Sequence, residues 1–240
     1  MIDAMLLEAI RVERIKQHQT WIESDGAEGK RVALDFAEWS GCDLSGINLS
    51  QADLYGANLR RSDLSGTNLC DAHLRGANLR CAILNGANLN QACLSNGRLY
   101  KAFLANATLE NADLSWSNLS QANFSQANLK GANLRGADLR GADLRGAILE
   151  GTNLSRANLE FADLSGANLK GSNLSDVNLE WALLLGANLT GVNLTHMQRT
   201  DISHLAQSRV KILNFRVRRF GWKIKVNSFY YRSYWPYYSQ

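Results

Sequence analysis

Hydrophobic residues recur at every fifth position along most of this chain. Counting in fives from Leu34 to Leu194 gives 33 positions, which we call central positions, and 31 of them are Leu. Trp39 and Phe124 occupy the other two. A period of five matches neither the 3.6-residue period of an α-helix nor the two-residue period of a flat strand. The pattern therefore predicts a solenoid built from short repeats.

The residues around each central position are also restricted. The residue two before it is small, being Ala in 22 of 33 cases, and the residue one before it is Asp or Asn in 23. A backbone that turns a corner every five residues would close a square coil in 20, so residues 32–196 hold about eight coils. Coils spaced like parallel strands, about 4.8 Å apart, give a rod about 40 Å long. We expect the central and small residues to point inward and the other three to face water.

The repeat unit A-(D/N)-L-x-x is clean in Ala132-Asn133-Leu134-Arg135-Gly136, and it resembles the pentapeptide-repeat family. The resemblance covers about 70% of the chain. It implies an all-β solenoid, a right-handed quadrilateral β-helix, whereas the periodicity alone also allows a triangular solenoid. A rod without a pocket suits a non-enzymatic protein-interaction scaffold that binds a partner through one outer face.

The resemblance also implies a sharper alternative, because some family members protect type II topoisomerases such as DNA gyrase by imitating duplex DNA. Such proteins are usually dimers with a strongly negative rod. Here residues 32–196 carry 12 Lys or Arg against 15 Asp or Glu. One column of four acidic residues is interrupted by apolar and amide side chains, and its members are Asp43, Asp63, Asp143 and Asp163. The charge pattern therefore weakens the DNA-mimic alternative.

Both ends of a solenoid need covering, because they expose apolar side chains and unpaired backbone. Residues 1–31 are expected to form an N-terminal amphipathic capping helix, over residues 2 to about 22, followed by a turn. Asp3 is the expected N-cap, and the helix should end before the turn at Ser24-Asp25-Gly26. Trp21 is expected to lie over the first coil. The stretch from His18 to Gly26 is similar to the leader of bacterial family members.

Residues 197–240 form a basic, aromatic C-terminal cap or tail, with 9 Lys or Arg against 1 Asp or Glu. Three interpretations stay open: a cap that can also form a homodimer through the C-terminal end, a segment that binds nucleic acid or an anionic membrane, and a segment without a definite role. The candidate contacts of the tail are its basic residues and a neighbouring aromatic: Arg216, Arg218, Arg219, Trp222, Lys223 and Lys225.

Side chains 20 residues apart line up in columns along the rod, and one face stands out. It is basic toward the N-terminus and acidic and aromatic toward the C-terminus. Its candidate interaction residues are Arg60, Arg61, Arg80, Arg98, Tyr100, Lys101, Arg140, Phe161 and Trp181. Stacked aromatic side chains are frequent anchors of protein interfaces, so this face is the candidate binding surface.

No catalytic, cofactor or metal site is expected, nor a small-molecule substrate. A second column, Asp53, His73, Cys93 and Asp113, has suitable residue types. It lacks a third residue that would orient a pair. The four Cys never lie 20 residues apart and are expected to be unpaired, as in a reducing compartment. With no apolar run long enough for a bilayer and no secretory signal, a cytoplasmic location is expected.

Overall fold

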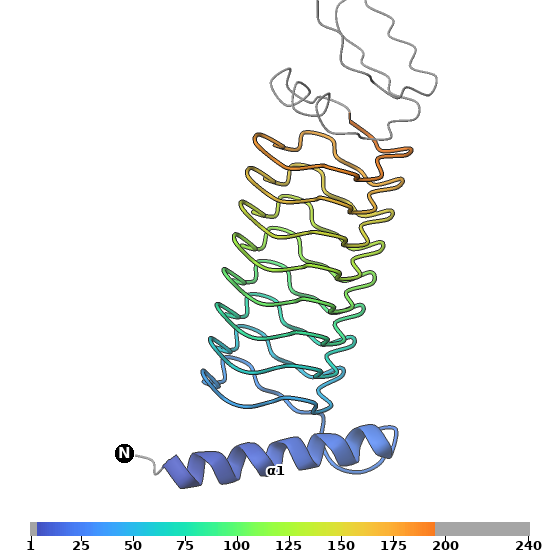
Figure 1. Ribbon diagram of the computed structural model, residues 1–240. Coiled ribbons are helices and arrows are strands. Elements are labelled where there is room, and N and C mark those ends of the chain that lie inside the picture. The colour runs from blue at the N-terminus through green and yellow to red at the C-terminus, as the bar shows by residue number, and fades with distance from the viewer. Residues whose placement is uncertain (1–3, 195–240) are drawn as a thin grey trace, which may run out of the picture.

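The computed structural model describes residues 4–194, in which a helix precedes a four-sided stack of coils (Figure 1). The helix, α1, spans Ala4–Glu23. The predictions for the tail, including its cap, dimer and binding roles, lie outside the described residues.

Each coil takes 20 residues. Every β-bridge is parallel and joins residues 20 apart, from Ala33 with Asp53 to Asn173 with Asn193, so the stack has about eight coils. Each pentapeptide contributes one isolated bridge and not a longer strand. The square coil is therefore confirmed. We number the four faces by their first central residue: face 1 by Leu34, face 2 by Trp39, face 3 by Leu44 and face 4 by Leu49.

The corners explain how an ordinary backbone bends every five residues. The residue two after each central position has a positive φ at every corner from Phe36 to Gly191, for example 67° at Gly46. The carbonyl of the central residue accepts a hydrogen bond from the N–H three residues later, as between Leu49 and Ala52 at 3.1 Å. These features define a type II β-turn. Gly is frequent at the corners because it adopts a positive φ without a steric cost.

The preference for Asp or Asn before each central residue has a hydrogen-bonding cause. Four of the five N–H groups of a unit bond to backbone carbonyls, three in neighbouring coils and one in the turn. The fifth N–H, one after the central residue, has a side-chain acceptor instead: Arg135 N donates to Oδ1 of Asn133 at 3.3 Å. The same bond recurs around the rod, as from Ser65 to Asp63 at 2.9 Å. The short side chain thus completes the pairing of the backbone donors.

The amide side chains also bond from coil to coil. Nδ2 of Asn153 donates to Oδ1 of Asn133 at 3.2 Å, Asn173 to Asn153 at 3.5 Å, and Asn193 to Asn173 at 3.1 Å. Asn133, Asn153, Asn173 and Asn193 therefore form a hydrogen-bonded ladder along the rod. It adds side-chain pairing to the backbone bridges.

Replacing Asn153 by Ala should lower the free energy of unfolding by about 1–2 kcal/mol, because the N–H of Ser155 loses its acceptor and Asn133 loses a donor. Asn153→Asp is the matched control, since it keeps the acceptor and removes only the donor. We expect a smaller loss for the control in chemical denaturation. Equal stability of Asn153→Ala and the wild type would contradict this role.

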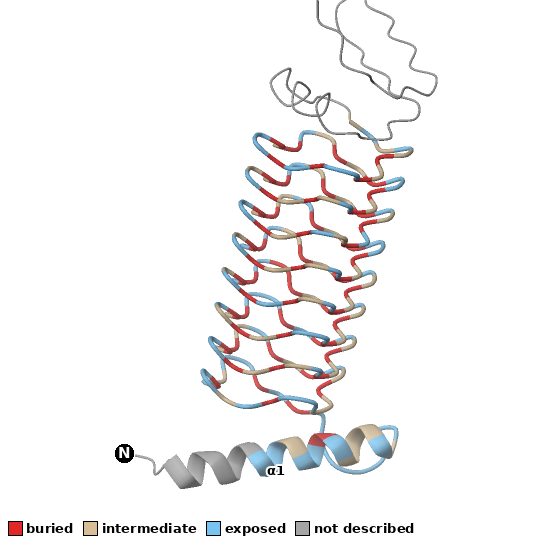
Figure 2. Ribbon diagram, in the orientation of Figure 1, coloured by how far each residue is buried: buried red, intermediate tan, exposed pale blue. Residues whose placement is uncertain are grey.

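The interior consists of the central residues and the small residues two before them (Figure 2). Phe124 and its stacking neighbours Leu104 and Leu144 are 0% exposed. Where Ser or Thr takes a small position, its hydroxyl donates to a backbone carbonyl, as Ser62 does to Leu59 at 2.6 Å. In the part of the chain that the structure describes, no buried side-chain polar atom lacks a hydrogen bond. The expected inward and outward positions are therefore confirmed.

Helix α1 lies across the first coil (Figure 1). It ends at Glu23, before the predicted turn, and Ile15 packs against the core. Its apolar residues form no stripe around the helix, so the prediction of an amphipathic helix was wrong. The expected N-cap, Asp3, lies outside the described residues. The role of α1 as a cap stays a prediction.

His18 joins α1 to the first coil, although the sequence pattern predicted no partner for it. His18 is buried; its Nε2 lies 3.0 Å from the carbonyl oxygen of Ser50, and its Nδ1 accepts from Val32 N at 3.1 Å. The ring of Trp21 stacks on that of His18, with centroids 5.8 Å apart. The polar contacts between the helix and the first coil are made by His18. The expected contact of Trp21 with the first coil stays a prediction.

Candidate interaction face

The structure places all nine candidate residues on face 2, in three adjacent columns that lie one before, one after and two after the central residues. Bridges such as Asn58 with Asn78 and Asn78 with Arg98 hold these columns in register. The nine residues do not form one patch. They divide into a basic patch, a neutralised middle and an aromatic patch.

The basic patch spans three successive coils and consists of Arg60, Arg61, Arg80, Arg98, Tyr100 and Lys101. The ring of Tyr100 lies between two cations: Cζ of Arg80 is 5.4 Å and Nζ of Lys101 is 5.2 Å from its centroid. The Tyr100 hydroxyl donates to Gln121 Oε1 at 3.2 Å. All five basic side chains are exposed, and none forms an ion pair with another described residue. The patch therefore presents an uncompensated positive charge.

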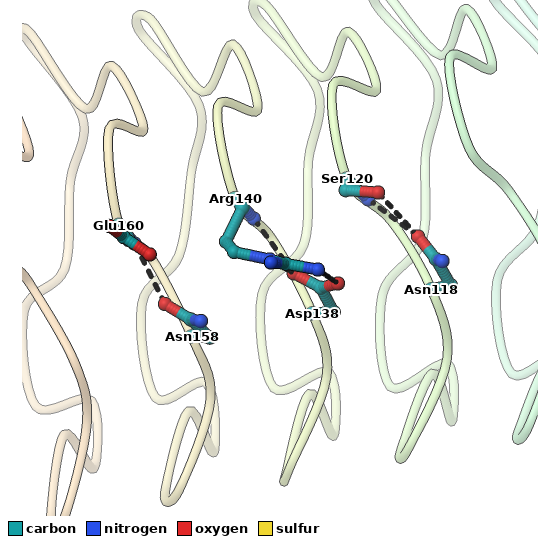
Figure 3. A network of polar contacts seen from close by, with 6 residues as sticks. All are labelled: Asn118, Ser120, Asp138, Arg140, Asn158 and Glu160. Carbon is teal, nitrogen blue, oxygen red and sulfur yellow. Dashed lines mark hydrogen bonds and ion pairs between the residues drawn. The ribbon is translucent and has the colours of Figure 1, made fainter.

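In the middle of face 2 the positive charge of Arg140 is neutralised by Asp138. The guanidinium of Arg140 binds both oxygens of Asp138, with Nε–Oδ1 at 2.8 Å and Nη2–Oδ2 at 2.7 Å (Figure 3). These bonds hold the pKa of Asp138 below its ordinary value. In the coils on either side, Ser120 and Glu160 donate their backbone N–H to Asn118 and Asn158. Arg140 is thus a neutralised member of the predicted face.

The aromatic patch lies on the last coils of face 2. Phe161 is 60% exposed and Trp181 is 53% exposed, and each follows a glutamate, Glu160 and Glu180. Around the corner, on face 3, Leu183 and Leu185 are also more than half exposed. Exposed apolar side chains that cluster in this way mark contact surfaces.

The corner that borders face 2 carries bulky side chains in a costly conformation. Arg61, Lys101, Phe161 and Trp181 have φ between 56° and 60°, in the left-handed region. Most corners that follow face 3 hold Gly in the same conformation, for example Gly66. A non-Gly residue there costs about 1–2 kcal/mol. Bulky residues with the same conformation also occupy the corner that follows face 1, namely Phe36, Trp116 and Arg156, so this backbone conformation does not by itself distinguish face 2.

The column weighed for metal binding is not assembled as a site. His73 Nδ1 lies 3.0 Å from Nη2 of Arg31, and Asp113 accepts from Asn133 at 2.9 Å. The thiol of Cys93 contacts Ser95 at 3.4 Å. Across residues 4–194, no group of three His, Cys, Asp or Glu side chains could hold a metal ion. His73, Cys93 and Asp113 therefore each contact a different neighbour.

Two of the four carboxylates in the acidic column on face 3, Asp143 and Asp163, lie against one arginine. Asp143 Oδ2 lies 2.6 Å from Arg145 Nη2, and Asp163 lies 3.9 Å from Nε of the same arginine. This arginine holds the pKa of Asp143 below its ordinary value, chiefly through its side-chain hydrogen bonds. The column does not present a continuous negative stripe.

Two further expectations concern disulfide bonds and membrane-spanning helices. Among the described residues none of the four cysteines forms a disulfide, as expected: Cys42, Cys70, Cys81 and Cys93. Among the helices of the described range, none has the length and apolar character to cross a membrane.

Comparison with known proteins identifies the repeat. The family model for pentapeptide repeats matches in 8 copies, covering residues 30–66, 57–99, 98–136, 132–171 and 172–196. This match confirms the predicted family and its right-handed β-helix solenoid. Members of this family are generally structural or interaction proteins without catalytic activity. None of the curated proteins matches the chain significantly.

Several solved structures are similar. The pentapeptide-repeat protein HetL of Nostoc sp. strain PCC 7120, involved in heterocyst differentiation regulation, is 33% identical over 76% of this chain and 91% of its own, with a TM-score of 0.41. A pentapeptide-repeat protein of the Arabidopsis thaliana thylakoid lumen is 34% identical over 44% and 71%, with a TM-score of 0.40. QnrB1, a plasmid-mediated fluoroquinolone resistance protein, is 18% identical over 74% and 94%, with a TM-score of 0.32.

Proposed function

The chain belongs to the pentapeptide-repeat family, and we propose that it is a non-enzymatic scaffold that binds a partner protein through face 2. The observation that carries this proposal is the basic patch, whose five cations are exposed on three consecutive coils without an acidic partner among the described residues. Three basic residues outside the patch are paired, Arg140 with Asp138, Arg145 with Asp143 and Lys170 with Glu150. Other basic residues of the described rod form no ion pair but lie on other faces, namely Arg75, Lys130, Arg135 and Arg156. What distinguishes face 2 is therefore the clustering of its cations.

The aromatic patch supplies the apolar part of the proposed interface. A charged patch steers a partner and fixes its orientation, whereas buried aromatic side chains contribute most of the affinity. Phe161 and Trp181 lie on the same face as the cations, about four coils away. A partner that contacts both patches would therefore extend along the rod.

The described acidic residues do not favour the DNA-mimic alternative, modulation of a type II topoisomerase. Three of them, Asp138, Asp143 and Asp163, lie against arginines. Binding of nucleic acid or an anionic membrane by Arg216–Lys225 and dimerisation through the C-terminal end concern residues outside the described range. These functions and the cytoplasmic location stay predictions.

The proposal is tested by reversing charge on face 2. Arg60→Glu with Arg80→Glu should reduce recovery of a co-purifying partner at least about tenfold. The reason is that the attraction between the two arginines and acidic groups of the partner becomes a repulsion. The matched control is Lys130→Glu with Arg135→Glu, which makes the same charge change on faces 4 and 1 at exposed residues. The control should recover the partner as the wild type does. Equal loss with both pairs would sink the assignment to face 2.

A further inference from the structure

We propose that face 2 also binds a second copy of this chain, with the two rods antiparallel and related by a two-fold axis through Ser120. The inference rests on the proposed function in one respect, because it assigns a partner to the same face. It is carried by the order of charges along the three columns of face 2.

In the column one after the central residues, basic residues near the N-terminal end are matched by acidic residues at equal distances from the middle toward the C-terminal end. Two copies placed antiparallel therefore bring opposite charges together. The members of this column are Ser40, Arg60, Arg80, Tyr100, Ser120, Arg140, Glu160 and Glu180. A two-fold axis at Ser120 places Arg60 opposite Glu180 of the second copy, and Arg80 opposite its Glu160. Both basic residues are exposed and form no ion pair within the described rod. By symmetry each pairing occurs twice.

The two flanking columns agree with this arrangement. A two-fold axis that lies in the interface, perpendicular to the rods, keeps each column opposite itself. The corner column then pairs Arg61 with Trp181, a cation with an aromatic ring. It pairs Cys81 with Phe161.

The column one before the central residues pairs Arg98 with Asp138, which already binds Arg140. Tyr100 falls opposite Arg140, so these groups form one network across the interface. Within residues 58–181 of face 2, no two like charges meet in this register.

Other registers are less favourable. Moving the axis by half a coil toward the N-terminus slides one rod past the other by a full coil and places Arg80 opposite Arg140, a like-charged pair. The same step in the other direction pairs Arg60 with position 200, beyond the described coils. Only the register about Ser120 gives acidic partners to both Arg60 and Arg80 inside the solenoid.

The size of the face sets the expected strength. Six coil steps of about 4.8 Å and a width of about 15 Å give about 450 Å² on each copy. The total, about 900 Å², is below that of a standard stable interface, so the dimer should be weak and reversible. Because its contacts are exposed ion pairs, it should weaken further in salt.

The experiment is sedimentation of the full chain at 50 and 500 mM salt, with two charge-reversed variants. Arg60→Glu with Arg80→Glu places acids opposite acids, and Glu160→Arg with Glu180→Arg places bases opposite bases. Each variant alone should be monomeric at a concentration where the wild type dimerises. Mixed in equal amounts, the two should form a heterodimer, because every reversed residue then meets an opposite charge.

Three results would overturn the inference: a wild-type monomer at both salt concentrations, a dimer that survives either reversal, or a mixture that stays monomeric. Far-UV circular dichroism confirms that each variant keeps the fold. Failure here is distinguishable from failure of the proposed function. A monomeric wild type whose partner is still lost in Arg60→Glu with Arg80→Glu refutes only the self-association.

Discussion

Replacing Phe124 by Ala is expected to cost about 3–5 kcal/mol of unfolding free energy, the largest effect of any single change considered for this protein. Phe124 is 0% exposed and stacks on face 3 between Leu104 and Leu144, which are equally buried. Removing the ring leaves a cavity in the middle of the rod. Since each coil contacts only its neighbours, the cavity also weakens the coupling between the two halves of the solenoid.

Phe124→Leu is the control, because Leu fills 31 of the 33 central positions. We expect it to cost less than about 1.5 kcal/mol, since the inward side chain stays large and apolar. Urea unfolding followed by far-UV circular dichroism measures both variants. A loss below about 1 kcal/mol for Phe124→Ala would mean that the neighbouring coils close over the gap.

Acidification is expected to release α1 from the first coil, through His18. The hydrogen bond from Val32 N to Nδ1 requires that nitrogen to be unprotonated, while Nε2–H donates to Ser50. Protonating Nδ1 would set one N–H against another. Burial, opposed by the Ser50 hydrogen bond and aided by the charge of Arg31, lowers the pKa of His18 from 6.5.

The sign of the effect follows from the unfolded chain. Above pH 6.5, the ordinary pKa, His18 is neutral in both states and its contribution to stability is complete. Below pH 6.5 the unfolded chain takes up a proton that the folded chain excludes. Stability then falls by up to about 1.4 kcal/mol for each pH unit until the folded-state pKa is reached.

Hydrogen exchange at the Val32 amide measures the release directly. Its protection factor, the ratio of the intrinsic to the observed exchange rate, should fall as the pH is lowered from 7.5 to 5.5. His18→Gln removes the titrating group, so the protection of the Val32 amide should differ less between the two pH values than it does in the wild type. His204→Gln, at a histidine far from α1 in the sequence, is the control and should keep the wild-type response. An unchanged response in His18→Gln would show that another group controls the seating of α1.

The sequence by itself determined the turn every five residues and the identity of the core, whereas the four-sided shape was implied by the family resemblance and not by the periodicity. This was possible because burial in a solenoid is set locally, by position within a five-residue unit that repeats with little variation. Leu at the central position and Ala two before it predicted which side chains point inward, and all described central residues up to Leu189 are buried. The ladder of Asn133 and its successors followed from the same 20-residue register.

Only the tertiary structure decided which side chains find partners. The seat of His18 depends on Ser50, 32 residues away, on an element that does not repeat, so no periodicity could reveal it. Neutralisation of Arg140 and exposure of Arg60 also depend on the reach of individual side chains, because both occupy the same position in the unit. The repeat restricts the inward residues, and the outward residues are distinguished by contacts that form only when the coils are stacked.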